Sequence, residues 1–399
     1  MNKKIHSSFG YITFVLSPII SLIIAINNYR CEWAKNVVWA FTAFYAFHFS
    51  APNKGADINA YIKKFLFFTN KVYSTPDFIK SLYSEQSTTL DIIEPLTSYL
   101  VSQNTNNYHF LLLIYGIYFG FFFSRNIWFF IDKTKNKITI QSFAILMLLI
   151  VEIGIWDING FRFWCAAQIF IYATINIVIL KNFKGYLFLI LACLMHLGLL
   201  LPAVIVILFR SVKIPLFLLF LFFLFTFFLA ELDMEVIRTS INNYAPSFLS
   251  NKLNLYTSEA YIEVVNETTD SYSMYYQLSK IIRIGIILFF TSILYINRKM
   301  FNKDIMFRLF IFYLLLGSFA NVLSQMPSGG RYLVIADFIL YGVMFYFVQE
   351  YKKIKFYKYI IYAVPILLIY AFYNFRIIGI HTFNIHHFIN NPLVSLFIN

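Results

Sequence analysis

The chain has 399 residues, of which 60% are hydrophobic and only 13% are charged. Soluble domains average about 45–50% apolar and about 25% charged residues, so this composition excludes an ordinary soluble protein. The net charge of +13 would indicate nucleic acid in a soluble protein, but here it is typical of Lys and Arg anchoring cytoplasmic loops, and we expect no nucleic-acid partner.

Long apolar runs predict membrane-spanning helices, each of about 20 residues. The first run follows Lys3 and Lys4 and lacks a small-residue cleavage site, so we interpret it as an uncleaved span. We therefore predict an all-α, polytopic membrane protein with about ten spans in one domain, residues 1–399. The spans are predicted near Phe9–Asn27, Trp33–Ser50, Tyr108–Ile131, Ile138–Trp156, Phe161–Leu180, Ile214–Glu231, Leu278–Ile296, Ile305–Leu323, Arg331–Val348 and Phe356–Asn374.

The orientation follows from four short basic connections, which lie at residues 133–137, 181–184, 298–303 and 352–358. All four should be cytoplasmic by the positive-inside rule. Counting spans back from the first of them places the amino terminus outside, although Lys3 and Lys4 oppose this assignment.

An even number of crossings must separate the second and third basic connections. We therefore expect residues 185–209 to form a broken or re-entrant helix pair, interrupted around His196-Leu197-Gly198. Broken helices at membrane depth occur where they are buried in protein or line a wet cavity. The interruption around His196 therefore indicates a functional site at this place in the chain.

Two long polar segments, residues 51–107 and 233–277, are then predicted to be periplasmic loops. The first contains amphipathic pieces and should form short helices that lie on the membrane. Loops of this length are usually functional or disordered. Because both fall on one side, we expect the working face there.

Arginines near membrane depth are the first candidates for chemistry, since charges there are costly. Arg162 follows Asp157 and Gly160 at a helix start, and Arg331 follows a Gly-Gly pair in the same way. A guanidinium suits phosphate oxygens, and Gly329 and Gly330 could turn backbone N–H groups toward an anion. Arg283 and Arg376 are predicted at the same level. The alternative is that these arginines are interfacial anchors or pair with acids such as Asp157.

Three further residues could carry a proton. Asp57 begins an amphipathic segment and is either a catalytic carboxylate or an N-cap, and Glu94 precedes Pro95 at a helix start. His196 lies at the predicted break and is either a site residue or a packing residue. We find no nucleotide loop or hydrolase motif, and Cys31, Cys165 and Cys193 have no metal-ligand spacing, so no metal or cofactor is expected.

These motifs, taken in order, resemble a known family. The set comprises Gly55-Ala56-Asp57 with Tyr61, Glu94-Pro95, Gly160-x-Arg162, His196, and Ser328-Gly329-Gly330-Arg331-Tyr332. It is similar to the EpsG-like branch of the bacterial O-antigen and capsule polymerases, the Wzy proteins, from roughly Phe9 to Asn374.

The resemblance implies an inner-membrane enzyme that joins oligosaccharide repeat units carried on undecaprenyl pyrophosphate at the periplasmic face. It implies that Arg162 and Arg331 stabilise the pyrophosphate leaving group, and that Asp57, Glu94 or His196 acts as the base. The expected partners are the lipid-linked oligosaccharide, membrane lipid and, as a further candidate, a chain-length regulator protein. An O-antigen ligase and a lipid-linked oligosaccharide flippase remain as alternatives.

Overall fold

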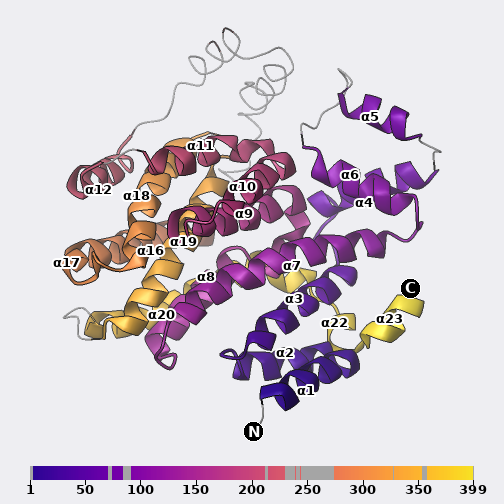
Figure 1. The fold of residues 1–399 in the computed structure, drawn as a ribbon, viewed down its shortest axis with the longest axis horizontal. Helices are drawn as coiled ribbons and strands as arrows, with labels where there is room; N and C mark the ends of the chain where they lie inside the picture. The colour runs from indigo at the N-terminus through magenta and orange to yellow at the C-terminus, as the bar shows by residue number, and fades with distance from the viewer. Residues whose placement is uncertain are drawn as a thin grey trace.

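The computed structural model describes residues 3–70, 74–83, 91–211, 214–229, 239, 243, 274–326, 328–352 and 357–398, and within them the regular structure is helical without strands (Figure 1). Helices dominate because a backbone in lipid must satisfy its hydrogen bonds internally. By length and composition, six helical segments suffice to cross a membrane: Tyr108–Lys133, Ile140–Ile179, Met274–Ile296, Ile305–Leu323, Gly330–Glu350 and Tyr357–Thr382. The architecture agrees with the expected all-α polytopic protein, and the count of about ten spans stays a prediction.

The amino-terminal third packs two helices against each other through small residues. The predicted first span is divided at Ser17 into α1 (Lys3–Leu16) and α2 (Pro18–Asn27), since proline lacks the N–H needed to continue a helix. Helix α3 (Glu32–Phe47) lies along α7 (Tyr108–Lys133). A Cβ on Gly116 would lie 2.5 Å from the Cβ of Ala46, so glycine permits this close approach.

Irregular turns interrupt the central helices. Helix α8 (Ile140–Glu152) is joined to α9 (Phe161–Thr174) by the 3₁₀ turn η1 (Ile155–Gly160), and the π-helical η2 (Ile175–Ile179) extends α9. Helix α10 (Lys184–Met195) ends at His196 and is followed by η3 (Leu197–Leu199) and α11 (Leu200–Phe209). The break therefore falls at the predicted residues. Whether this pair is re-entrant remains a prediction.

The carboxy-terminal half is built around α19 (Gly330–Glu350), whose buried face packs on α18 (Ile305–Leu323), α8 and α16 (Met274–Ile296). The remaining elements here are α12 (Leu216–Phe225), α17 (Arg298–Phe301), α20 (Tyr357–Asn374), the π-helical η4 (Phe375–Gly379), α21 (Ile380–Thr382), α22 (His386–Ile389) and α23 (Pro392–Ile398). Most of the predicted loop 233–277 lies outside the described residues.

The connections meet at one end of the molecule, which we call the basic end. Arg30 donates to the carbonyl oxygens of Ile131 (2.9 Å) and Asn136 (2.5 Å), and the Asn136 amide donates to the carbonyl of Gln349 (2.9 Å). Tyr346, near the end of α19, donates to Asp304 in the turn that precedes α18 (2.5 Å). Three of the four basic connections are thus adjacent to these contacts.

The opposite end of α7 carries three short helices, which we call the cap: α4 (Asp57–Asn70), α5 (Thr75–Tyr83) and α6 (Ile93–Ser102) (Figure 1). Amphipathic α4 buries Ile58, Tyr61, Phe65 and Phe68. Since α7 has 26 residues, the cap and the basic end are separated by roughly 39 Å at 1.5 Å per residue.

Candidate functional site

A small hollow of about 30 Å³ opens where α4, the start of α9, the break after α10 and the start of α19 meet. Segments far apart in the sequence therefore supply its walls. It is lined by Asp57, Tyr61, Gly160, Arg162, Phe163, Trp164, His196 and Arg331. Six of these residues, Asp57, Tyr61, Gly160, Arg162, His196 and Arg331, are among those that the sequence singles out.

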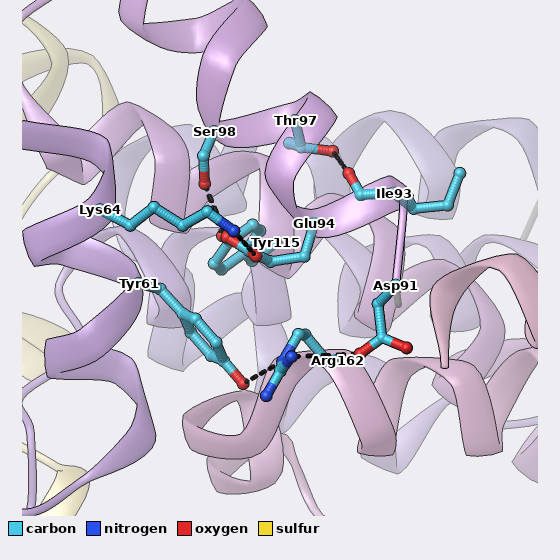
Figure 2. Close-up of polar contacts among 9 residues, drawn as sticks. All are labelled: Tyr61, Lys64, Asp91, Ile93, Glu94, Thr97, Ser98, Tyr115 and Arg162. Carbon is cyan, nitrogen blue, oxygen red and sulfur yellow. Dashed lines mark hydrogen bonds and ion pairs between the residues drawn. The ribbon is translucent and has the colours of Figure 1, made fainter. Parts of the chain in front are cut away.

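The turn η1 positions Arg162. Asp157 is buried and accepts a hydrogen bond from the backbone N–H of Gly154 (2.8 Å), which fixes the turn that leads into α9. Arg162 then projects from the first turn of α9 between two partners (Figure 2): its Nη1 lies 3.1 Å from Asp91 Oδ2, and its Nε donates to the Tyr61 hydroxyl at 3.4 Å. The guanidinium is held in place, with its side chain 32% exposed.

Asp91 links that arginine to the break in α10. Its second oxygen, Oδ1, accepts from the backbone N–H of Leu197 at 3.1 Å, and the N–H of neighbouring Ile92 donates to the carbonyl of Leu194 at the same distance. The side chain is 8% exposed. Sequence reasoning missed Asp91, because nothing in the local spacing distinguishes it from an ordinary loop aspartate.

His196 forms the break itself. Its backbone is extended (φ −152°, ψ 111°), and its Nδ1 accepts the backbone N–H of Gly198 at 3.1 Å. A neutral ring with this bond carries its proton on Nε2 and is a donor there. The Tyr332 hydroxyl donates to the Gly198 carbonyl at 2.7 Å, which ties the break to α19.

Arg331 completes the cationic lining. Its guanidinium lies 5.4 Å above the centre of the Phe163 ring, and the residue is exposed. The ion pairs of the described chain do not include Arg331. The preceding glycines serve the turn: the Gly329 N–H donates to the Met326 carbonyl (2.9 Å), so this N–H is used within the protein. Gly330 is open, with nothing near a Cβ placed there.

Asp57 and Tyr61 form the cap side of the hollow. The N–H of Ile58 donates to the Asn159 side chain at 3.4 Å, which docks the start of α4 on η1. Asp57 is exposed, and its Oδ2 would be 3.6 Å from a Cβ on Gly160. Burial raises the pKa of Tyr61 despite the nearby Arg162, so its phenol stays protonated and polar at neutral pH.

Glu94 lies behind the hollow. Its side chain is 1% exposed and is paired with Lys64 at 3.0 Å. The hydroxyls of Ser98 (2.8 Å) and Tyr115 (3.1 Å) donate to its other oxygen (Figure 2). Both oxygens are engaged, and the edge of the Tyr115 ring contacts Tyr61 with centroids 6.1 Å apart. This network supports the wall of the hollow.

The other predicted residues lie elsewhere. Arg283 pairs with Asp337, with its Nε 2.6 Å from Oδ2, and Asp337 lies roughly 9 Å beyond Arg331 along α19. Arg376 is exposed on η4. The hollow therefore gathers two of the four predicted arginines.

The chemistry of the lining is that of an anion site with a carboxylate at its rim. Two guanidiniums and an imidazole N–H are donors suited to phosphate oxygens. Within the described residues, no group of three or more His, Cys, Asp or Glu could hold a metal ion. Comparisons with known protein families, curated proteins and solved structures give no match to this chain.

Proposed function

We propose that this chain is a bacterial inner-membrane polymerase that joins undecaprenyl-pyrophosphate-linked oligosaccharide repeat units into O-antigen or capsule polysaccharide. The observation that carries the proposal is the shared hollow: Arg162, Arg331, His196, Asp57 and Tyr61 line one site. Those are residues of the motifs that resemble the polymerase family.

The placement of the hollow supports a periplasmic active face. Arg331 is at the first turn of α19, whereas the basic end includes the last turn of that helix, roughly 30 Å away. If the basic connections are cytoplasmic, as the positive-inside rule requires, the hollow faces the other side. Lipid-linked repeat units are presented there.

The lining suits glycosyl transfer with a pyrophosphate leaving group. The acceptor hydroxyl oxygen forms a bond to the anomeric carbon of the donor sugar. The bond from that carbon to the pyrophosphate oxygen breaks, and its electron pair leaves with the lipid pyrophosphate. Arg162 and Arg331 stabilise the charge that develops on this oxygen, and the Nε2–H of His196 donates to the same anion.

The proton of the acceptor hydroxyl goes to a carboxylate, and Asp57 is the group we assign. It lines the hollow and is exposed. Glu94 is committed to Lys64 and two hydroxyls, and His196 Nδ1 is committed to a backbone N–H. Of the two candidate carboxylates, Asp57 is the one that lines the hollow.

The test is a surface-polysaccharide profile of the host strain deleted for the gene and complemented with wild type, Arg162→Ala or Arg331→Ala. We expect the deletion and both variants to leave lipid A-core capped with a single repeat unit, at normal membrane levels of protein. Arg376→Ala, an exposed arginine outside the hollow, is the matched control and should restore long chains.

The outcomes separate the proposal from its alternatives. A deletion strain that lacks the cap altogether points to a ligase or a flippase and overturns the polymerase assignment. A profile identical to that of the parent strain removes the polysaccharide function for that polymer. Long chains in both alanine variants would leave the enzyme class standing and overturn the roles of the arginines.

A further inference from the structure

A second hollow lies near the basic end, between the start of α3, the second half of α7 and the junction of α9 with η2. It has a volume of about 180 Å³, and its polar lining includes Lys35, Arg125, Asn126, Asp132, Tyr172 and Asn176. In Figure 1, α7 runs between α3 and α9. Residues 162 and 176 are roughly 20 Å apart along the α9–η2 helix, so the two hollows are distinct.

Arg125 is the charge that needs an explanation. It lies within the candidate span Tyr108–Lys133, roughly 12 Å from the end of that helix. Its guanidinium donates to the Asn36 side chain (2.7 Å) and lies over the Phe121 ring (4.4 Å to the centroid). The ion pairs of the described residues do not include it. A cation at such depth without a carboxylate marks a binding function by default.

Asn126 gives a second, independent indication. It is fully buried, and its Nδ2 donates to both the carbonyl (2.8 Å) and the side-chain oxygen (2.7 Å) of Gln168, which fixes the orientation of the amide. Its Oδ1, in a residue that lines the hollow, has no hydrogen-bond partner in the described part of the chain. Buried acceptors are nearly always paired, so this oxygen is suited to a donor on a ligand.

The net charge of the side chains that line this hollow indicates the charge of the ligand. Lys35 and Arg125 supply two positive charges and Asp132 one negative charge, which leaves one net positive charge in the lining. That balance fits a phosphodiester, which carries one negative charge, better than a pyrophosphate, which carries at least two. Because the hollow opens among candidate spans, the phosphodiester that can reach it is the headgroup of a membrane lipid.

We propose that this hollow binds the headgroup of a membrane glycerophospholipid at the basic end, with Arg125 and Lys35 contacting the phosphate and Asn126 Oδ1 accepting from a headgroup donor. The site goes beyond the proposed polymerase function and does not depend on it. The Arg125 guanidinium donates from Nη1 to Ser124 (2.8 Å) and from Nη2 to Asn36 (2.7 Å), and Phe121 lies under it. Its remaining N–H groups are donors suited to phosphate oxygens.

The experiment is native mass spectrometry of the purified full-length protein in detergent, titrated with phosphatidylglycerol. We expect a retained lipid on the wild type and a roughly tenfold weaker retention by Arg125→Gln, the loss expected for one charge-assisted hydrogen bond. Lys35→Gln, at a partly buried position, should weaken retention as well if Arg125→Gln fails to fold. Lys133→Gln removes the same charge from an exposed position of the same helix and should bind like wild type.

Two further arms identify the source of the phosphate. Diacylglycerol with the same acyl chains should not be retained, and millimolar inorganic phosphate should not displace phosphatidylglycerol. Equal retention of diacylglycerol would overturn the headgroup site in favour of an apolar groove. Displacement by inorganic phosphate, or wild-type retention by both glutamine variants, would overturn the lipid proposal.

Discussion

Replacing Asp91 with asparagine isolates the contact that holds Arg162. The amide has nearly the shape of the carboxylate and keeps one oxygen for the Leu197 N–H, but it removes the negative charge 3.1 Å from the Arg162 guanidinium. A hydrogen bond to a charged group contributes about 1.5–3 kcal/mol. The lower value applies here because the arginine side chain is 32% exposed, and screening by solvent weakens the pair.

About 1.5 kcal/mol corresponds to roughly a tenfold change in rate. We therefore expect Asp91→Asn to reduce polymer formation about tenfold, seen as shorter chains and more single repeat units in the complemented deletion strain. Asp91→Glu keeps the charge and should recover part of the loss. This recovery distinguishes a positioning role from a purely structural one.

The control for this prediction is Asp77→Asn. Asp77 is an exposed acid of α5 in the same cap, bonded to Ser74 at 2.5 Å, and the change removes the same charge. Its polymer profile should match wild type. Chains of normal length from Asp91→Asn, or an equal loss in the Asp77 variant, would refute the reasoning about the Arg162 contact.

Three further changes test other parts of the structure. Gly198→Ala places a Cβ 2.9 Å from the Tyr332 hydroxyl oxygen, so we expect short chains at normal protein levels, and long chains would contradict the close approach. Asp337→Asn leaves Arg283 unpaired in a buried setting, a cost of about 3–5 kcal/mol, which should lower the thermal midpoint by several degrees; an unchanged midpoint would argue against the pair. Burial holds the pKa of His387 below its ordinary 6.5. The contribution of His387 to the free energy of unfolding is therefore fully present above pH 6.5 and is lost as the pH drops below that value. The measurement is the protection of residues 384–398 against hydrogen exchange, relative to the intrinsic rate at each pH. This protection should fall in acid and fall less in His387→Gln, and pH-independent protection would contradict the prediction.

Helix positions were predictable from the sequence because the apolar runs are long and lipid leaves the backbone few alternatives. The run predicted at Tyr108–Ile131 becomes α7, and the run at Ile305–Leu323 becomes α18 with the same bounds. The division of the first span at Pro18 was also predictable, because a proline favours the first turn of a new helix.

The starts of two site helices were also predictable. Arg162 and Arg331 each follow a glycine-containing turn, and the structure begins α9 and α19 at those turns. Their meeting with Asp57 depends on how α4 docks on η1, through a contact between residues 101 positions apart. No local pattern encodes such a distance.

The same limit explains the residues that were missed or placed elsewhere. Asp91 acts through partners 71 and 106 positions away. The sequence places Arg283 at the same outer level as Arg162 and Arg331. Its partner, however, is Asp337 on another helix, 54 positions away. A count of residues along the chain gives the approximate depth of a charge and leaves its partner undetermined.

Glu94 and Asp57 show how environment separates two carboxylates that the sequence treats alike. Both stand at the first turn of a short cap helix, and both were candidates for the base. Glu94 would have to give up a lysine and two hydroxyl donors to take a proton. Asp57 is exposed beside the hollow, and the hydrogen bonds and ion pairs of the described residues do not engage its carboxylate. In the proposed mechanism we therefore assign proton transfer to Asp57, the carboxylate with fewer bonds. Glu94 instead holds Tyr115 beside Tyr61, whose hydroxyl accepts a hydrogen bond from Arg162.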